Sequence, residues 1–168
     1  IETIYAEVQD PTYLLNKRSR YKTFQESLTQ ISPFLPDKGN LLEVGSYCGF
    51  FLDTFKKKYN NWECIGVEPS KWAAEYARNH LKINTRTGTL ENNIKDLPSD
   101  FDTVVAWDVL EHLNDPSAFL IQINSVMKLN GIFCFSTLDI DNWFPKLMGK
   151  HWPWLMEMHL FYYKTDTT

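Results

Sequence analysis

The stretch from Leu41 to Phe51, which reads L-L-E-V-G-S-Y-C-G-F-F, constrains the fold of this chain more than any other segment. Its first residues are apolar without strict alternation, as is typical of a buried parallel strand. Gly45 and Gly49 then indicate a tight turn, because glycine adopts positive φ and lets a ligand approach the backbone closely. The segment therefore predicts a strand, a loop able to hold a nucleoside, and a helix that begins near Phe50.

The spacing of these glycines separates two classes of nucleoside cofactor. A dinucleotide-binding loop needs glycine at three positions that here hold Gly45, Tyr47 and Phe50, so only one of them fits. The loop more closely resembles that of Rossmann-like S-adenosylmethionine-dependent methyltransferases, in which an acidic residue precedes G-x-G-x-G. Glu43, Gly45 and Gly49 match that pattern, whereas Tyr47 replaces the middle glycine. An ordinary strand, turn and helix, with glycine for steric reasons alone, is the alternative.

A second segment, Trp62 to Ser70, favours the cofactor interpretation. It reads W-E-C-I-G-V-E-P-S, which predicts a short strand that ends at Glu68 and a helix that begins around Pro69. A carboxylate at the end of the second strand can accept hydrogen bonds from both ribose hydroxyls of an adenosine. Such a charge-assisted bond contributes roughly 1.5–3 kcal/mol. For Glu68 taken alone, a solvated glutamate at a strand end is the alternative.

The composition narrows the class of protein. The 168 residues, 43% of them hydrophobic and 15% aromatic, suit one folded domain with a substantial core. Seventeen basic and twenty-one acidic residues give a net charge of −4, which argues against a broad nucleic-acid-binding surface. Apolar stretches fall short of the ~20 residues that cross a bilayer and no secretory leader is recognisable, so we expect a soluble, cytoplasmic protein. The three cysteines lack metal-ligand spacing, and no metal site is expected.

Helix-like and strand-like segments alternate along the chain. Their periodicity predicts helices over 21–31, 70–80 and 116–127, and further strands over 81–85, 101–107 and 132–136. This order predicts an α/β fold: a Rossmann-like, doubly wound, mainly parallel sheet with helices on both faces. Ligands of such sheets bind beyond the carboxyl ends of the strands, where we expect Gly45, Glu68 and Asp108 to meet.

Four segments together resemble class I S-adenosylmethionine-dependent methyltransferases, especially the bacterial subgroup akin to ubiquinone-biosynthesis O-methyltransferases. In chain order they are L-L-E-V-G-S-Y-C-G-F-F-L (41–52), G-V-E-P-S-K-W-A-A-E-Y-A (66–77), W-D-V-L-E-H-L-N-D-P (107–116) and M-K-L-N-G (127–131). They span roughly residues 41–140 in the order and separation of the family. Their joint occurrence is far more specific than any one of them.

The resemblance implies S-adenosylmethionine as cofactor and S-adenosylhomocysteine as product. Gly45 and Gly49 would approach the methionine part, Glu68 would hold the ribose, and Asp108 would lie near the methionine end. The loop after the third strand would lie beside the adenine. The expected cofactor contacts are Glu43, Gly45, Ser46, Tyr47, Gly49, Glu68, Pro69, Thr89, Leu90 and Asp108.

Histidine is the expected catalytic group if the methyl acceptor is a hydroxyl. Alignment of acceptor and methyl group can supply roughly 7–11 kcal/mol, and a base with a pKa near ~6.5 can remove the hydroxyl proton. The candidates are His112, which the resemblance places beside the acceptor pocket, and His159, in a tail similar to the family's E-H-L-Y-Y-F region but with Met158 before the histidine. His112 could instead fix the local turn. Aromatic residues of the tail could line an acceptor pocket or pack as core, namely Trp143, Trp152, Trp154 and Tyr162.

We expect three parts: an N-terminal helical segment packed on the domain (1–40), a cofactor-binding core (41–140) and an aromatic tail near the acceptor pocket (141–168). The family's sheet has seven strands and only five are recognisable, so the last two are expected to be lacking and the chain to be a fragment. One edge of the fifth strand would then be unpaired, which favours a homodimer.

Three functions compete at this point. The leading one is a methyltransferase that acts on a small-molecule acceptor, without a nucleic-acid partner. The second is a module that binds S-adenosylmethionine without catalysis, which Tyr47 and the lacking strands favour. The third, a nicotinamide-dependent oxidoreductase, is disfavoured by the glycine spacing.

Overall fold

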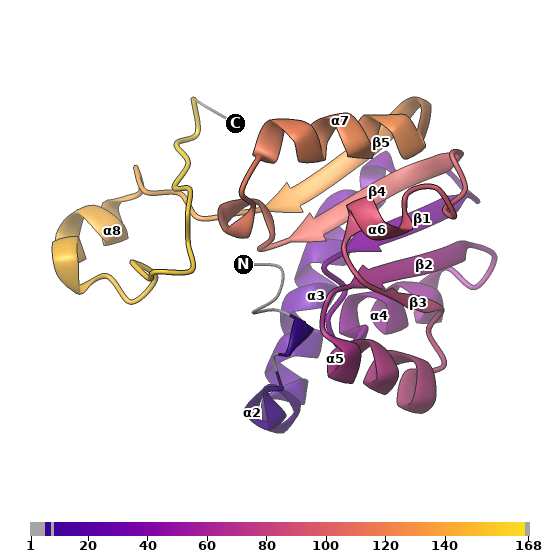
Figure 1. Cartoon of the computed structure of the whole chain (residues 1–168), viewed down its shortest axis with the longest axis horizontal. Coiled ribbons are helices and arrows are strands. Elements are labelled where there is room, and N and C mark those ends of the chain that lie inside the picture. The colour runs from indigo at the N-terminus through magenta and orange to yellow at the C-terminus, as the bar shows by residue number, and fades with distance from the viewer. Residues whose placement is uncertain (1–5, 8, 167–168) are drawn as a thin grey trace.

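The computed structural model describes residues 6–7 and 9–166, and a single five-stranded sheet forms its centre (Figure 1). The strand order is β3-β2-β1-β4-β5, and every pairing is parallel. The strands are β1 (Asn40–Val44), β2 (Glu63–Glu68), β3 (Thr85–Thr87), β4 (Phe101–Trp107) and β5 (Met127–Ser136). The predicted α/β architecture with a parallel sheet is thus confirmed.

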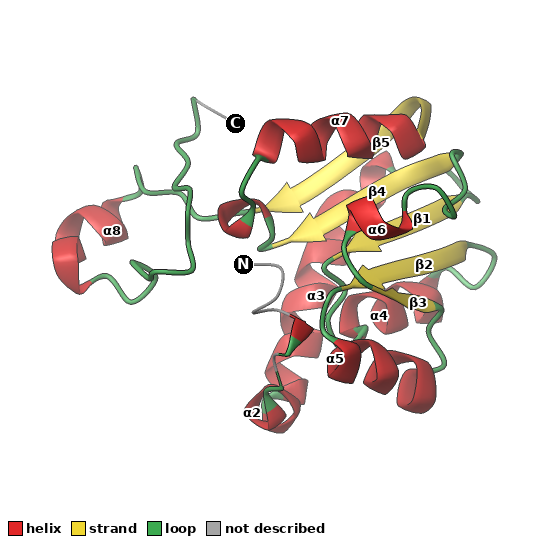
Figure 2. Ribbon diagram, in the orientation of Figure 1, coloured by secondary structure: helices red, strands yellow, loops and turns green. Residues whose placement is uncertain are grey.

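Helices cover both faces of this sheet (Figure 2). The α-helices are α2 (Pro11–Leu15), α3 (Lys17–Ile31), α4 (Phe50–Lys58), α5 (Lys71–Tyr76), α6 (Leu90–Asn93), α7 (Pro116–Val126) and α8 (Trp143–Met148). The short 3₁₀ or π turns are η1 (Ser32–Phe34), η2 (Ala77–Leu81), η3 (Leu110–His112) and η4 (Gly149–His151).

Two apolar layers hold the helices to the sheet. On one face, α3 and α4 bury residues such as Leu28 and Phe55 against β1 and β2. On the other face, α6 and α7 bury residues such as Leu90 and Ile123 against β1 and β4. Because the inner strands are covered on both sides, β1 reads as a continuous apolar run with one buried acid, Glu43.

The third strand lies further along the chain than the sequence predicts. The prediction placed it over 81–85, but Ala77–Leu81 continues the preceding helix as a π turn and β3 covers Thr85–Thr87. Lys82, with a φ of 59°, follows the end of that turn. Ile83 is buried against the α4 side of the core, so this apolar side chain belongs to helix packing and not to a strand.

The transition from α7 to β5 also differs from the prediction. The helix ends at Val126 and the strand begins at Met127, whereas the sequence suggested a strand that begins at residue 132. The pairing of β5 with β4 shifts register between Phe101 and Thr103, which indicates a bulge. Asn130, with a φ of 64°, lies within this irregular part of the strand, so the M-K-L-N-G segment (127–131) belongs to β5.

The residues after β5 form a tail at the carboxyl ends of the strands, and Figure 1 shows its α8 loop extending away from the sheet. The tail returns to the body through Leu160, whose N–H donates to the Glu111 carbonyl at 2.7 Å, and Tyr163, whose N–H donates to the Leu138 carbonyl at 3.2 Å. Among the described residues, no strand pairs with the outer edge of β5, as predicted. None of the described helices is long and apolar enough to cross a membrane.

Candidate cofactor site

A cavity of about 520 Å³ opens at the carboxyl ends of β1, β2 and β4, where a doubly wound sheet binds its ligand. Its walls come from these strand ends, from the loops that follow them and from α2, α3 and α7. The structure brings all but one of the expected cofactor residues to this cavity: Glu43, Gly45, Ser46, Tyr47, Glu68, Pro69, Thr89, Leu90 and Asp108.

Two glycines shape the loop between β1 and α4, each for a different steric reason. Gly45 has a φ of 73°, and a Cβ there would lie 2.6 Å from Cγ2 of Val109, which also lines the cavity. Gly49 has a φ of 78°, and a Cβ there would lie 3.0 Å from Cβ of Ala77. Gly49 therefore serves the packing of α4 against the helix that follows β2, and it does not line the cavity.

Tyr47 lies where the family pattern has glycine, and its φ of 44° is unusual for an aromatic residue. Its ring packs edge-on against Tyr13 with 4.5 Å between ring centroids, and it lies 6.1 Å from Trp72. Tyr47 is half-buried and lines the cavity. The ring therefore lies in an aromatic cluster with Tyr13 and Trp72 beside the cavity.

Glu68 ends β2 with both carboxylate oxygens held by the backbone. Oε2 accepts from the Tyr47 N–H at 2.8 Å and Oε1 accepts from the Ser70 N–H at 2.7 Å. Burial raises the pKa of Glu68 to about 7, while these two hydrogen bonds oppose the increase. The carboxylate thus has a fixed orientation between the glycine loop and the start of α5, and it lines the cavity.

Two buried polar atoms beside Glu68 lack a hydrogen-bond partner among the described residues. They are Oε2 of Glu43 and Oγ of Ser46. Burial, followed by the nearby charge of Glu68, raises the pKa of Glu43 well above its usual range. Buried polar groups without partners are rare in native proteins. Both residues line the cavity, but these two atoms are themselves buried, and Oγ of Ser46 lies beside Gly66 of β2.

The remaining cofactor candidates lie on the parts of the cavity wall that follow β3 and β4. Thr89 caps α6, with its hydroxyl accepting from the Asn92 N–H at 3.2 Å, and Leu90 is buried beside it. Asp108 follows β4 with a φ of 55°, and its Oδ1 accepts from the Ser136 hydroxyl at 2.7 Å. This bond joins the ends of β4 and β5 and fixes the Asp108 side chain at the cavity.

The two candidate bases are neighbours whose ring planes are tilted by 56°, although only His112 lines the cavity. Nδ1 of His112 lies 3.0 Å from the Met158 carbonyl, and Nδ1 of His159 lies 2.7 Å from the Trp154 carbonyl. A carbonyl oxygen only accepts, so Nδ1 donates in each ring, and the lone pair of the neutral imidazole is on Nε2. The ring centroids are 4.7 Å apart.

Glu111 adjoins this histidine pair. Its side chain is only 1% exposed, and its Oε2 accepts from the Thr137 hydroxyl at 3.0 Å. Burial raises the pKa of Glu111, and the charge of Asp108 adds to the increase. The sequence places Glu111 next to His112, but only the tertiary structure brings His159 to them.

The aromatic residues of the tail do not line the cavity. Trp143 and Trp154 are 71% and 53% exposed, whereas Trp152 is buried against Tyr162 within the tail itself. The alternative of core packing therefore describes Trp152, and neither alternative describes the two exposed tryptophans.

The N-terminal helices also contribute to the cavity, which no local sequence signal indicated. Tyr13, Arg20, Thr23 and Phe24 all line it. The Arg20 guanidinium lies over the Tyr13 ring at 4.7 Å. Helical periodicity marks only the apolar face of α3, so it could not show that Arg20, on the polar side, faces a ligand site.

The sequence model of a methyltransferase domain family matches residues 16–167, which is most of the chain. The chain belongs to this methyltransferase domain family. Among curated relatives of this methyltransferase domain, a ubiquinone biosynthesis O-methyltransferase from Rhodopseudomonas palustris (strain HaA2) is 33% identical over 108 residues. That alignment covers 61% of this chain and 41% of the relative, so the chain spans about two fifths of the relative's length.

Solved structures agree with the fold of this methyltransferase domain. A SAM-dependent methyltransferase from Archaeoglobus fulgidus superimposes with a TM-score of 0.72 at 20% identity, over 94% of this chain and 70% of that one. A SAM-dependent methyltransferase from Thermotoga maritima gives a TM-score of 0.70 at 24% identity, over 93% of this chain and 70% of that one. The fold is that of S-adenosylmethionine-dependent methyltransferases.

Proposed function

We propose that this methyltransferase domain binds S-adenosylmethionine in the cavity and transfers its methyl group to a hydroxyl of a small-molecule acceptor. The observation that carries the proposal is the Glu68 carboxylate, held by the Tyr47 and Ser70 N–H groups on the cavity wall. Each carboxylate oxygen has a second lone-pair site with which to accept from a ribose hydroxyl. The O-methyltransferase relatives support a hydroxyl as the acceptor group.

The residues of the cavity fit this cofactor in charge and shape. Gly45 and Glu43 belong to the cavity wall at the end of β1, where the resemblance places the methionine part of the cofactor. Arg20 provides a cation for the methionine carboxylate. Pro69, Thr89 and Leu90 provide the adenine side of the site, and Asp108 lies near the methionine end, as the resemblance implies.

When bound, the cofactor supplies an activated methyl group on a sulfonium, so the protein has to align the acceptor and remove its proton. His112 has the geometry for the second task. Its Nδ1 donates to the Met158 carbonyl, which fixes the ring, and Nε2 is the atom that would take the hydroxyl proton. His159, packed against His112, is the second candidate for this base.

Calorimetry with S-adenosylmethionine, S-adenosylhomocysteine and NAD tests the cofactor. We expect both sulfur compounds to bind and NAD not to bind. Binding of NAD without binding of either sulfur compound would contradict the proposal and favour a nicotinamide-dependent oxidoreductase.

A methyl-transfer assay with panels of phenols, aliphatic alcohols and amines tests the reaction. Turnover of a hydroxyl compound that falls in His112→Ala or His159→Ala, but not in His151→Ala, supports the proposal. Cofactor binding without turnover of any acceptor would indicate a binding module. Turnover confined to amines would exclude the hydroxyl.

A further inference from the structure

We propose that Glu111, His112 and His159 bind a divalent first-row transition-metal ion such as Zn²⁺. Each of the three offers one ligand atom, and these atoms all lie within 4.8 Å of one another. Two imidazoles and one carboxylate are a ligand set that zinc uses where a further coordination position is open to water or substrate. The inference does not depend on the proposed methyl transfer.

The separation of the ligand atoms is close to what a metal requires. With metal–ligand bonds of about 2.1 Å, tetrahedral ligand atoms lie roughly 3.4 Å apart. The most distant atoms of the trio, within 4.8 Å of each other, therefore need to approach by no more than roughly 1.4 Å. Metal binding therefore requires a small adjustment of these three side chains.

The hydrogen bonds around the histidines match those of metal ligands. A metal-bound histidine usually donates its other ring N–H to a carbonyl or carboxylate, which fixes the ring and its tautomer. Here Nδ1 of His112 meets the Met158 carbonyl at 3.0 Å and Nδ1 of His159 meets the Trp154 carbonyl at 2.7 Å. Nε2 is then the atom of each ring that would coordinate the ion.

The carboxylate is likewise fixed and its surroundings favour a cation. Glu111 is 1% exposed, and the Thr137 hydroxyl donates to its Oε2 at 3.0 Å. Asp108 adds a second carboxylate close enough to interact with Glu111 through its charge. Burial of a carboxylate without a cation is costly, and a divalent ion offsets that cost.

The site would join the tail to the body at the acceptor end of the cavity. Glu111 and His112 belong to η3 after β4, whereas His159 belongs to the tail. His112 lines the cavity, so an acceptor oxygen there could reach an ion at this site. A bound metal lowers the pKa of a coordinated oxygen, and in that case the histidines act as ligands and the ion takes over the activation of the hydroxyl.

Metal binding to the chelator-treated protein, without cofactor or acceptor, tests the proposal. We expect one equivalent of Zn²⁺ or Co²⁺ to bind, with a Co²⁺ visible spectrum of a nitrogen and oxygen site, and Mg²⁺ to bind far more weakly. His112→Ala and His159→Ala should each lower the Zn²⁺ affinity at least roughly 100-fold, because loss of an outer hydrogen-bond partner alone already costs about 10- to 100-fold.

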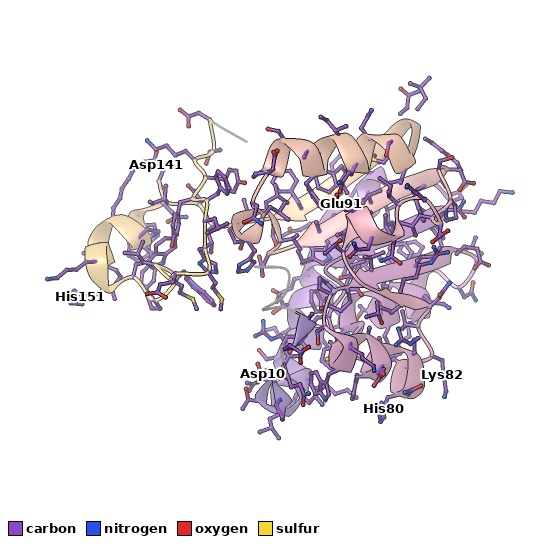
Figure 3. The ribbon with its side chains drawn as sticks, in the orientation of Figure 1. Asp10, His80, Lys82, Glu91, Asp141 and His151 are labelled. Carbon is purple, nitrogen blue, oxygen red and sulfur yellow. The ribbon has the colours of Figure 1, made fainter. Side chains whose placement is uncertain are left out.

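His151→Ala is the matched control, since Figure 3 shows His151 on the outer side of the tail, away from the sheet. Its Zn²⁺ affinity should equal that of the wild type. Equal affinity in all these variants, or no binding to the wild type, would overturn the proposal. If a histidine variant does not fold, Glu111→Gln replaces it, and unchanged Zn²⁺ affinity together with an unchanged Co²⁺ spectrum in that variant would also overturn it.

Discussion

Glu68 shows how a single residue can serve both the fold and a ligand. Its two oxygens organise the Tyr47 and Ser70 N–H groups, which connects the glycine loop to the start of α5. Burial raises its pKa to about 7 from an ordinary value of 4.5, so the folded protein holds the Glu68 proton at pH values where the unfolded chain has lost it. The free energy of unfolding therefore depends on the pH through this residue.

Replacement of Glu68 by glutamine should flatten this pH dependence. For a carboxyl group with a raised pKa, the stabilisation is complete below pH 4.5 and is lost as the pH rises through about 7. For Glu68 the loss amounts to roughly 3 kcal/mol. Urea unfolding of the ligand-free protein between pH 5 and 8 measures this loss. The free energy of unfolding should decrease less with rising pH in Glu68→Gln than in the wild type. Glu63→Gln, exposed at the other end of β2, should behave like the wild type. If the free energy of unfolding had the same pH dependence in the wild type and in Glu68→Gln, a raised pKa of Glu68 would be contradicted.

The proposed role of Arg20, which is to bind the methionine carboxylate, can be tested with ligands that have or lack this carboxylate. Arg20→Ala should weaken binding of S-adenosylmethionine about 10- to 100-fold, because a charge-assisted hydrogen bond contributes roughly 1.5–3 kcal/mol. Binding of methylthioadenosine, which lacks the amino-acid part, should change little. Calorimetry with both ligands measures the difference, and Arg18→Ala, outside the cavity, is the control. Equal losses for both ligands would argue against a contact with the carboxylate.

At the scale of elements, the loop between β1 and α4 depends on backbone conformations that most residues avoid. Gly45, Tyr47 and Gly49 all have positive φ within five residues of chain. Tyr47 is tolerated because its ring packs on Tyr13 and its N–H donates to Glu68. The loop thus combines local strain with contacts from α2 and β2, and neither contact is visible in the spacing of its glycines.

Substitution of alanine for Gly45 and for Gly149 should distinguish backbone strain from a steric clash of the new Cβ. Both glycines have positive φ, at 73° and 51°, but a Cβ at Gly45 would lie 2.6 Å from Val109, whereas nothing lies within 4 Å of a Cβ at Gly149. Gly149→Ala should cost roughly 1–3 kcal/mol of stability from strain alone, because the ψ of −130° at Gly149 lies outside the left-handed helical region. Gly45→Ala should cost more and should weaken cofactor binding, as thermal unfolding and calorimetry would show. Val109→Ala should recover part of the Gly45→Ala loss; no recovery would mean that strain alone decides.

At the scale of the whole molecule, the open edge of the sheet is the main feature that a second chain could use. The outer edge of β5 pairs with no strand in the described part of the chain. Leu129 of β5 is 93% exposed and Phe135 is 37% exposed. Unpaired edges with apolar side chains promote association, so the chain should self-associate through β5 as its concentration rises.

Leu129→Lys should reduce this association, because a charged side chain on an edge strand opposes pairing. Sedimentation equilibrium at several concentrations should show a lower average mass for Leu129→Lys than for the wild type. Leu15→Lys, at an exposed leucine of α2, should leave the mass unchanged. A wild-type protein that stays monomeric at all concentrations would show that β5 is not an interface.

The sequence by itself determined the order of the elements, the parallel sheet and the part of the cavity wall that lies at the strand ends. These features depend on local signals: apolar strands, glycines that permit positive φ, and acids at strand ends. The sequence placed the start of β3 before its position in the structure and the start of β5 after it. For β3 the reason is that an apolar residue such as Ile83 can pack against helices as well as form part of a strand. Only the tertiary structure brought Arg20 to the cavity, since helical periodicity gives no direction for a polar face. It alone brought His159 to Glu111 and His112, because contacts between distant residues follow from how the tail packs on the sheet and not from any spacing along the chain.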